Sequence, residues 1–566
     1  PKPETRNAKP GTRNRFSFSD SLFCPLMNRP PFLLLALYAF LAAVLFPYLC
    51  WYVNNPDTFQ YLMITRHYLE GDFREAINGY WSPLLSWLML PFTGQDFGDI
   101  PALKTLQLVI GAGVLWTWTS VLRRSVMPEP YAEALSYAAL PFVLAYAFLS
   151  PTADLLFLWL TLALFRFLAK GSALTDEQNA KRFALLGALA YYAKAFGLPL
   201  FLFLLVSEWW QVRKLAVGRR LLLRALGIFL LLIAPWVTAI SLKYGHFTIS
   251  EAAAFNRSPG VAPMPGQVMQ LPVLSNELTK PSGPHAICAW EEPMQLFWTG
   301  RVSEPTCVVP GFLQVLERNL LTIWYFDFQR TTGWGLLLLL ALFLIFRHKL
   351  QLRQEPLSQR SRLLAGLFLL AFYGGYSLIL VHTRYIWIST WMMLFLAAFF
   401  AAAIEQGGRP WFYLARVLFL ITLLVAIKRP VKELLFGLDR DVPAIWIWKA
   451  VRQPLQTMDV LYQQDRQLQE ATYYLRSLKL LDGPIASRYS ESPDRHRYSS
   501  SLFVAYHNKT PYRGQINDRQ AGALEVIRES GAKYFLLWHE PDTTWQGAFP
   551  LFQSGELKVF PVPSGP

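Results

Sequence analysis

The sequence predicts a mainly α-helical membrane protein with about eleven transmembrane helices and a small α/β region at its C-terminal end. Of its 566 residues, 53% are hydrophobic and only 16% are charged. Long apolar runs recur up to about residue 430, and short basic loops separate several of them. Much of the net charge of +15 lies in those loops, where Lys and Arg set the orientation of a chain in the membrane. The basic charge therefore does not indicate a partner among nucleic acids.

The first span covers residues 32–52, which are apolar almost throughout and long enough to cross a bilayer core of about 30 Å. The preceding tail, 1–31, is basic, which predicts that it lies in the cytoplasm. No small-residue cleavage site follows a short apolar core, so we expect a retained anchor and not a removed signal peptide.

An outer loop, 53–101, follows the first span. Residues 58–70 place apolar side chains at helical spacing, which predicts a short helix lying along the membrane surface. Residues 80–92 are apolar but too short to span, and we expect them to dip into the interface.

Further apolar runs predict the other spans, which are 102–122, 131–149, 155–169, 221–241, 333–346, 363–381, 386–403 and 410–427. Residues 183–210 have basic flanks on both sides and are too few for two full spans, so two short helices are expected to meet near Lys194–Pro199. Non-helical backbone at that depth needs surrounding protein or a water-filled cavity. A second outer loop, 243–332, is rich in Pro and Gly.

The composition changes near residue 430. The sequence therefore predicts a membrane domain over 32–429 and a soluble outer domain over 430–566. Helices are expected at 459–480 and 518–530. Four segments have the composition of strands: IASRY (485–489), VAYHN (504–508), KYFLLW (533–538) and LKVFPV (557–562).

Two aspartates are candidates for chemistry on the outer side. Asp57 could act as a general base toward an acceptor hydroxyl, or it could cap the helix that starts at Thr58. Tyr61 follows one helical turn later and faces the same way. Asp154 could serve the dipole of its own helix, could orient acceptor hydroxyls, or could hold a divalent cation such as Mg²⁺ or Mn²⁺ together with Asp57.

Three cations are candidates for binding a phosphate. Lys194 lies inside apolar sequence, where it must be paired, face water or snorkel toward the interface. Arg384, next to Tyr385 at the end of a span, could anchor the interface or grip a phosphate with its planar fork. Arg66 offers the same choice, with a surface pair to Glu70 as its alternative. Because these stretches are distant in the chain but all end near the outer surface, we expect their side chains to share one pocket.

The sequence leaves open whether two of the cysteines form a disulfide. Cys288 and Cys307 lie in the outer loop, where an oxidising compartment would allow a disulfide, and the alternative is two unpaired thiols. The sequence has no zinc-ligand spacing and no glycine-rich phosphate loop of the common kinds.

These motifs resemble the GT-C superfamily of polyprenyl-phosphate-dependent glycosyltransferases, and within it the protein O-mannosyltransferases and the lipid A aminoarabinose transferases. Asp57 with Tyr61 matches the acidic motif of the first outer loop, and the segment 150–154 matches the second. Lys194 and the pair Arg384-Tyr385 match the later motifs. Where several relatives carry Lys-Pro-Pro in the first outer loop, this chain has Trp-Ser-Pro at 81–83, so its phosphate contacts must come from other cations.

The resemblance implies an enzyme of the bacterial inner membrane with its C-terminal domain outside. It would transfer a hexose or pentose from a polyprenyl-phosphate donor to a lipid, glycan or protein acceptor, inverting the anomeric carbon, with Asp57 as general base. A lipid or sugar transporter that transfers no bond would also use polar residues in broken helices, and a non-catalytic membrane scaffold is a third reading.

Overall fold

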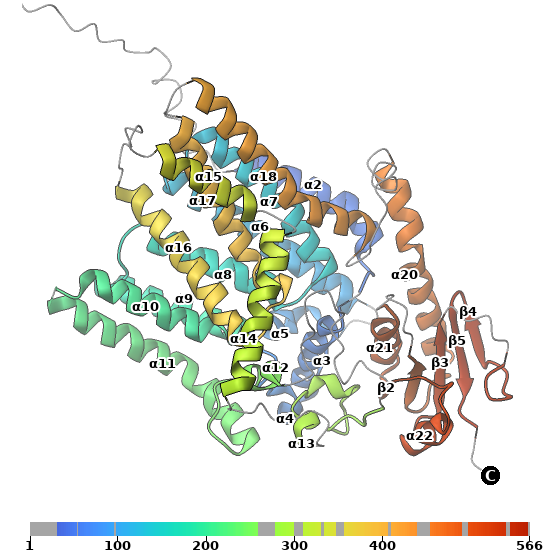
Figure 1. Ribbon diagram of the computed structural model, residues 1–566. Coiled ribbons are helices and arrows are strands. Elements are labelled where there is room, and N and C mark those ends of the chain that lie inside the picture. The colour runs from blue at the N-terminus through green and yellow to red at the C-terminus, as the bar shows by residue number, and fades with distance from the viewer. Residues whose placement is uncertain are drawn as a thin grey trace, which may run out of the picture.

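A bundle of apolar helices carries, at one end, a layer of short helices and a small sheet in the computed structural model (Figure 1). The structure describes residues 31–53, 55–94, 98–214, 216–258, 278–298, 309–329, 333–346, 356–405, 409–437, 453–489, 496–538 and 544–563.

The structure has a helix at every predicted span. These helices are α2 (Phe32–Leu49), α6 (Asp99–Arg124), α7 (Glu129–Leu149), α8 (Ala153–Leu168), α9 (Glu177–Ala193), α10 (Gly197–Val212), α11 (Ala216–Tyr244), α15 (Gly333–Phe346), α16 (Pro356–Ser377), α17 (Trp387–Glu405) and α18 (Arg409–Phe436). By length and composition, 6 helices of the described chain can cross a membrane, or up to 7 if a bent pair counts as one span. The mainly α, polytopic fold is therefore confirmed, while the number of crossings stays a prediction.

The outer helices of the bundle expose apolar surface. In their most apolar windows, α2 is only 22% buried and α11 and α18 are each 28% buried, whereas α17 at the centre is 83% buried. Side chains such as Leu231 and Trp210 are more than half exposed. Exposed apolar surface of this extent is rare on soluble monomers and suits contact with lipid, so the chain is an integral membrane protein.

The predicted break between two short helices is confirmed. Helix α9 ends at Ala193, Lys194 has extended backbone angles, and α10 begins at Gly197. The helices pack closely, because the ring of Phe201 occupies the space where Gly187 would carry a Cβ atom. The break therefore places Lys194 at the meeting point of two helix ends.

Short helices form the layer at the end of the bundle. They are α3 (Asp57–Glu70), α4 (Phe73–Ala76), α5 (Leu84–Met89), η2 (Leu90–Phe92), α12 (Ala252–Arg257), η3 (Ala289–Glu291) and α13 (Gln295–Trp298). The predicted helix at 58–70 is α3, but protein covers it on nearly all sides, and its first nine residues are all buried. It is thus an internal element of the protein, and its position relative to the membrane surface stays a prediction.

The expected long loop, 243–332, contains structure that the sequence reading missed. Helix α14 (Val309–Ile323) continues into a π-helical turn, η4 (Trp324–Gln329). The side-chain amide of Asn319 donates to the carbonyl of Ser377, 2.9 Å away, which attaches α14 to the end of α16.

The C-terminal region is a five-stranded sheet with helices. Its elements are α20 (Pro454–Ser477), β1 (Ile485–Arg488), α21 (His496–Asn508), β2 (Tyr512–Ile516), α22 (Ala523–Glu529), β3 (Tyr534–Trp538), β4 (Phe552–Ser554) and β5 (Leu557–Pro561). The strand order is β2-β1-β3-β5-β4, with β1 parallel to β2 and β3, and β5 antiparallel to β3 and β4. Strands β2 and β4 were not predicted.

The prediction of a strand at 504–508 is wrong, because this segment is the end of helix α21. Parallel strands need a crossover connection, and α21 supplies it between β1 and β2. One side of α21 packs against the sheet and the other against α3, where Phe503 and Tyr506 contact Phe59. A helix buried on both sides has a continuous apolar sequence that periodicity cannot distinguish from a buried strand.

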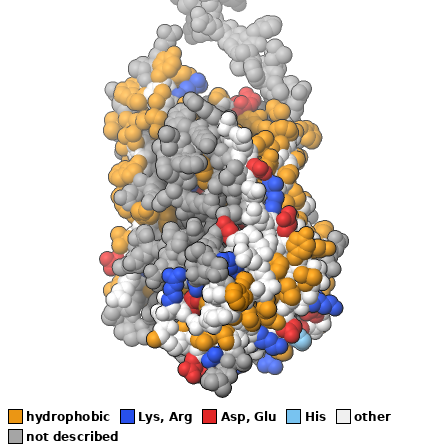
Figure 2. Space-filling model, turned by 90° about the vertical axis from the view of Figure 1, so that its right-hand side faces the viewer, with side chains coloured by type: hydrophobic (Ala, Val, Ile, Leu, Met, Phe, Trp, Pro, Cys, Tyr) orange, Lys and Arg blue, Asp and Glu red, His pale blue; other side chains and the backbone are white. Residues whose placement is uncertain are grey.

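The C-terminal region packs directly on the bundle. The ring of Tyr462 in α20 stands edge-on to Tyr52 at 5.1 Å, and its hydroxyl donates to the carbonyl of Leu434, 3.3 Å away in α18. Helix α18 continues through the predicted boundary at residue 430, and the division into domains stays a prediction. Figure 2 shows the side of the molecule that carries α20 and the sheet. Charged side chains are concentrated on the lower part of that side, where the sheet lies in Figure 1.

Candidate functional site

Asp57 is the first residue of α3, and its carboxylate makes contacts with side chains from elsewhere in the chain. The N-cap residue is Pro56, whose side chain cannot cap the helix. The carboxylate instead accepts a hydrogen bond from the indole N–H of Trp290, 3.1 Å away, and forms an ion pair with Arg384. The backbone N–H of Asp57 donates to the side chain of Asn55 at 3.0 Å. The helix therefore presents Asp57 to a site, and the capping alternative is not realised.

Asp154 lies in the first turn of α8, close behind the turn that ends α7. The hydroxyl of Thr152 donates to Oδ2 of Asp154 at 2.8 Å, and the other oxygen is paired with the ammonium of Lys194. The chain turns sharply between α7 and α8, and Arg384 contacts both this carboxylate and Asp57, so the two aspartates lie close together.

Lys194 reaches this site from the break between α9 and α10. Its ammonium lies 3.4 Å from the centre of the Tyr385 ring, in addition to its pair with Asp154. The side chain points into the protein and does not snorkel to the membrane surface. A lysine with a carboxylate on one side and an aromatic face on the other keeps its charge away from bulk water.

Arg384 joins the two aspartates. It belongs to η5 (Thr383–Tyr385), a single turn before α17, and the hydroxyl of Tyr146 fixes this turn by donating to the Arg384 carbonyl at 2.6 Å. One guanidinium nitrogen bonds Asp57, and Nε lies 3.7 Å from Oδ2 of Asp154. Among the residues that the structure describes, Nε of Arg384 has no hydrogen-bond acceptor although it is buried.

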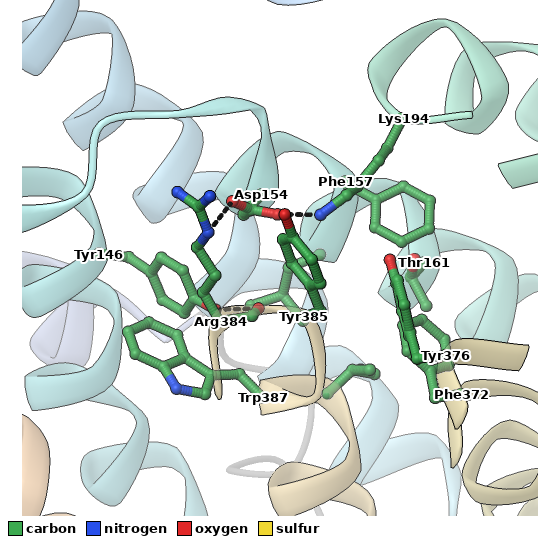
Figure 3. Close-up of a pocket in the computed structure, with 12 residues that line it drawn as sticks. Tyr146, Asp154, Phe157, Thr161, Lys194, Phe372, Tyr376, Arg384, Tyr385 and Trp387 are labelled. Carbon is green, nitrogen blue, oxygen red and sulfur yellow. Dashed lines mark hydrogen bonds and ion pairs between the residues drawn. The ribbon is translucent and has the colours of Figure 1, made fainter. Parts of the chain in front are cut away.

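A small pocket opens among these groups (Figure 3). Its charged lining is Asp154, Lys194 and Arg384, and the remaining lining residues are aromatic or aliphatic apart from Thr161: Tyr146, Phe157, Leu158, Thr161, Phe372, Tyr376, Tyr385, Trp387 and Ile388. It encloses about 270 Å³ of empty space, part of it open to solvent. Only about 10 Å³ of it has room for a water-sized molecule, so the paired side chains nearly fill the pocket.

The charges of the cluster balance. Two carboxylates face one ammonium and one guanidinium, and every one of these side chains is largely buried. Burying isolated charges is costly, whereas paired charges with additional hydrogen bonds are tolerated. A ligand phosphate entering the pocket would compete with the carboxylates for the two cations.

Arg66 and Tyr61, which were also predicted as site residues, do not line this pocket. Arg66 donates to the carbonyl of Tyr506, 3.2 Å away, stacks on that ring at 4.0 Å and lies 3.7 Å from Asp99. It thus connects α3 to α21 and α6. Tyr61 lies one turn after Asp57 as predicted, but its ring packs against Trp81 at 5.6 Å and does not line the pocket.

The sequence reading missed Trp290 and Thr152 as partners of the two aspartates. Thr152 directly precedes the helix that carries Asp154, so its N-cap position was the available signal. Trp290 had no local signal, because it comes from a loop far along the chain.

A divalent cation held by Asp57 and Asp154 stays a prediction. No three His, Cys, Asp or Glu side chains gather in the part of the chain that the structure describes, and both aspartates already pair with cationic side chains.

The predicted disulfide involves a residue outside the described part. Cys307 lies outside the described residues, while Cys288 is a buried thiol, free within the described chain, whose sulfur lies 3.7 Å from the Gln60 amide nitrogen. The pairing of these two cysteines therefore stays a prediction.

Fold and site together define a polytopic α-helical membrane protein with a buried, charge-balanced cluster at the end of its helix bundle. Comparison with protein-family models finds no match, and comparison with curated protein sequences finds none either. A solved structure similar to this chain is that of ArnT from Cupriavidus metallidurans bound to undecaprenyl phosphate. It is 14% identical, covers 94% of this chain and 99% of its own, and gives a TM-score of 0.48.

Proposed function

We propose that this chain is a membrane glycosyltransferase that moves a sugar from a polyprenyl-phosphate donor to an acceptor on the outer side, with inversion at the anomeric carbon. The observation that carries this proposal is the cluster itself. Asp57, Asp154, Lys194 and Arg384 come from four separate elements and meet beside one pocket. They are also the residues on which the resemblance to the GT-C superfamily rests.

The two cations suit a phosphate leaving group. When the bond between the anomeric carbon and the phosphate oxygen breaks, negative charge develops on that oxygen, and fixed cations stabilise it. Arg384 has a buried N–H group without an acceptor among the described residues, and it projects beside the pocket. Lys194 adds a second positive charge.

Asp57 supplies the base. The acceptor oxygen bonds the anomeric carbon, the bond to phosphate breaks, and the hydroxyl proton passes to the carboxylate. In this mechanism Arg384 moves toward the donor phosphate, which frees the oxygen of Asp57 that it held to accept the proton. Donor binding would thereby release the base, and Asp154 would keep Lys194 in place.

Other parts of the proposal follow from this chemistry. The lipid tail of the donor would lie against the apolar helices, which expose lipid-facing surface. The acceptor is a lipid, glycan or protein that approaches from the end of the bundle carrying the sheet. We place the enzyme in a bacterial inner membrane with this end in the periplasm.

The test uses the full chain in lipid nanodiscs with radiolabelled undecaprenyl-phosphate pentose and hexose donors and fractionated envelope lipids, glycans and peptides as acceptors. We expect transfer of label to one acceptor class, and a loss of at least about 100-fold in kcat for Asp57→Asn. The matched control is Asp99→Asn, since Asp99 is also the first residue of a helix and also pairs with an arginine, but lies outside the cluster.

Two outcomes would contradict the proposal. Transfer that Asp57→Asn leaves unchanged would remove the base from the mechanism. In proteoliposomes, label that crosses the bilayer without any exchange of the bond to phosphate would identify a transporter instead.

A further inference from the structure

Three consecutive residues of the second outer loop each contact a different part of the protein. The indole of Trp290 donates to Asp57 at 3.1 Å, Glu291 bonds the ring nitrogen of His67 at 2.8 Å, and Glu292 pairs with Lys243 at 2.8 Å. They follow one another in and directly after η3. The segment is therefore fixed at both ends of α3 and at the end of α11.

The same segment is attached to the C-terminal sheet. The carbonyl of Ile287 accepts the backbone N–H of Tyr512, 2.6 Å away, so the chain at 287–288 runs beside the edge strand β2. Further upstream, the N–H of Thr279 donates to the carbonyl of Arg513 at 2.7 Å. Trp290 thus extends from a backbone that both the sheet and the layer of short helices hold.

The indole itself has little freedom. Trp290 is 2% exposed, and its ring lies within 6 Å of three aromatic rings, those of Tyr80 at 5.6 Å, Phe255 at 5.7 Å and Trp81 at 5.8 Å. Trp81 also donates its indole N–H to the Trp290 carbonyl at 3.2 Å. An N–H group held this firmly can fix the direction of the carboxylate that accepts from it.

The two oxygens of Asp57 have different partners. Oδ2 is paired with Arg384, which the donor phosphate attracts in the proposed reaction. Oδ1 accepts a hydrogen bond from Trp290, which is uncharged and is therefore not attracted by the phosphate. Once Arg384 moves, Trp290 is the partner that keeps the carboxylate aimed at the acceptor hydroxyl.

We propose that Trp290 is a positioning residue for Asp57, and that its indole N–H holds the general base in its reactive orientation after Arg384 turns to the donor. This inference rests on the proposed glycosyltransferase function. It predicts that loss of the N–H group lowers the rate of the chemical step while donor binding is kept, since Trp290 does not line the pocket of Lys194 and Arg384.

The experiment replaces Trp290 in three ways in the full chain. Trp290→Phe removes the N–H and part of the ring, Trp290→His keeps a ring N–H in a smaller side chain, and benzothienylalanine keeps the shape of Trp with sulfur in place of the N–H group. We expect kcat to fall about tenfold or more with Phe and with the isostere, and less with His. The KM for the undecaprenyl-phosphate sugar should change less than about twofold.

The matched control is Trp545→Phe. Trp545 is also buried and also donates its indole N–H, at 2.6 Å, to an aspartate that is paired with an arginine, namely Asp518 with Arg488. That cluster belongs to the C-terminal sheet, so its loss should leave kcat within about twofold of the wild type. Thermal unfolding in detergent verifies that each variant is folded.

The outcomes separate the two proposals. If the wild type transfers no sugar, the proposed function fails. If the wild type transfers sugar but the folded isostere variant retains its kcat, or if Phe is as active as or more active than His, the role of Trp290 fails alone. A rise in KM with unchanged kcat would also overturn it. The isostere keeps the test decisive if Trp290→Phe does not fold, because it preserves the packing.

Discussion

Arg384 and Asp57 form a buried ion pair between a single helical turn that precedes α17 and the first residue of α3. The same guanidinium lies 3.7 Å from Asp154, so one cation serves two carboxylates. Any ligand that attracts Arg384 therefore changes the surroundings of both aspartates at once. The cluster is therefore a candidate active site, and its ion pairs also hold the helix ends together.

Removal of Arg384 should destabilise the protein. Arg384→Gln leaves two buried carboxylates with only Lys194 as a cation, and breaking a buried pair typically costs about 3–5 kcal/mol. We expect a clearly lower midpoint of thermal unfolding in detergent. Adding Asp57→Asn to this variant removes one unpaired charge and should restore part of the loss, which a double-mutant cycle measures.

The control for this prediction is Arg416→Gln. Arg416 pairs with Glu405 at 2.6 Å, but its side chain is 49% exposed, and such exposed pairs contribute little to stability. Equal effects of the two substitutions, or no recovery in the double variant, would mean that Arg384 and Asp57 are not energetically coupled.

Lys194 should contribute to binding of the lipid phosphate. We expect Lys194→Met to raise the Kd for undecaprenyl phosphate, used as the probe, by about tenfold or more, because a charge-assisted hydrogen bond to phosphate is lost. Microscale thermophoresis in nanodiscs gives this Kd. Lys243→Met is the control, since Lys243 also pairs with a buried carboxylate, Glu292, but does not line the pocket. An unchanged Kd for Lys194→Met would exclude Lys194 from the phosphate site.

Much of the helix arrangement could be predicted from the sequence, because the length of an apolar run and the basic residues beside it can be read directly along the chain. The break at Lys194 followed from two basic flanks around an apolar segment that was too short. The segment 504–508 misled the same reasoning, since a helix buried on both sides loses its periodicity. Strand β4 is short and only partly buried, which gave no pattern to detect.

The site could be predicted only in part. The sequence pointed to four site residues because a charge in or beside an apolar run is costly unless it is paired or functional. These residues are Asp57, Asp154, Lys194 and Arg384. Their pairing depends on how the helices pack, which no local pattern contains. Trp290 could not be found at all, because an aromatic residue in an outer loop is unremarkable until the fold places it on a carboxylate.

Arg66 should affect the C-terminal region and not donor binding. Its contacts are with Tyr506 and Asp99, so Arg66→Met should loosen α21 from α3. We expect faster limited proteolysis of the C-terminal region and a KM for the donor within about twofold of the wild type. A tenfold rise in KM without faster proteolysis would instead place Arg66 in the donor site.

The pair of His67 and Glu291 should make stability depend on pH. Burial lowers the pKa of His67, but its hydrogen bond to Glu291 and the charges of Glu291, Asp72 and Glu75 raise it more, so the pKa lies above its usual value. A group whose pKa is raised by folding stabilises the protein fully below the unfolded value, about 6.5, and loses this effect as pH rises through the folded value.

The measurement compares wild type with His67→Gln. We expect the difference between their unfolding midpoints to be larger at about pH 6 than at about pH 9, because only the protonated imidazole forms the ion pair. His246→Gln is the control: its side chain is 60% exposed and its pair with Glu251 should contribute little at either pH. A difference that stays constant or grows with pH would show that His67 is neutral in the folded protein. Glu291 would then hold its loop by accepting from the backbone N–H groups of Ile287 and Cys288, and not through an ion pair.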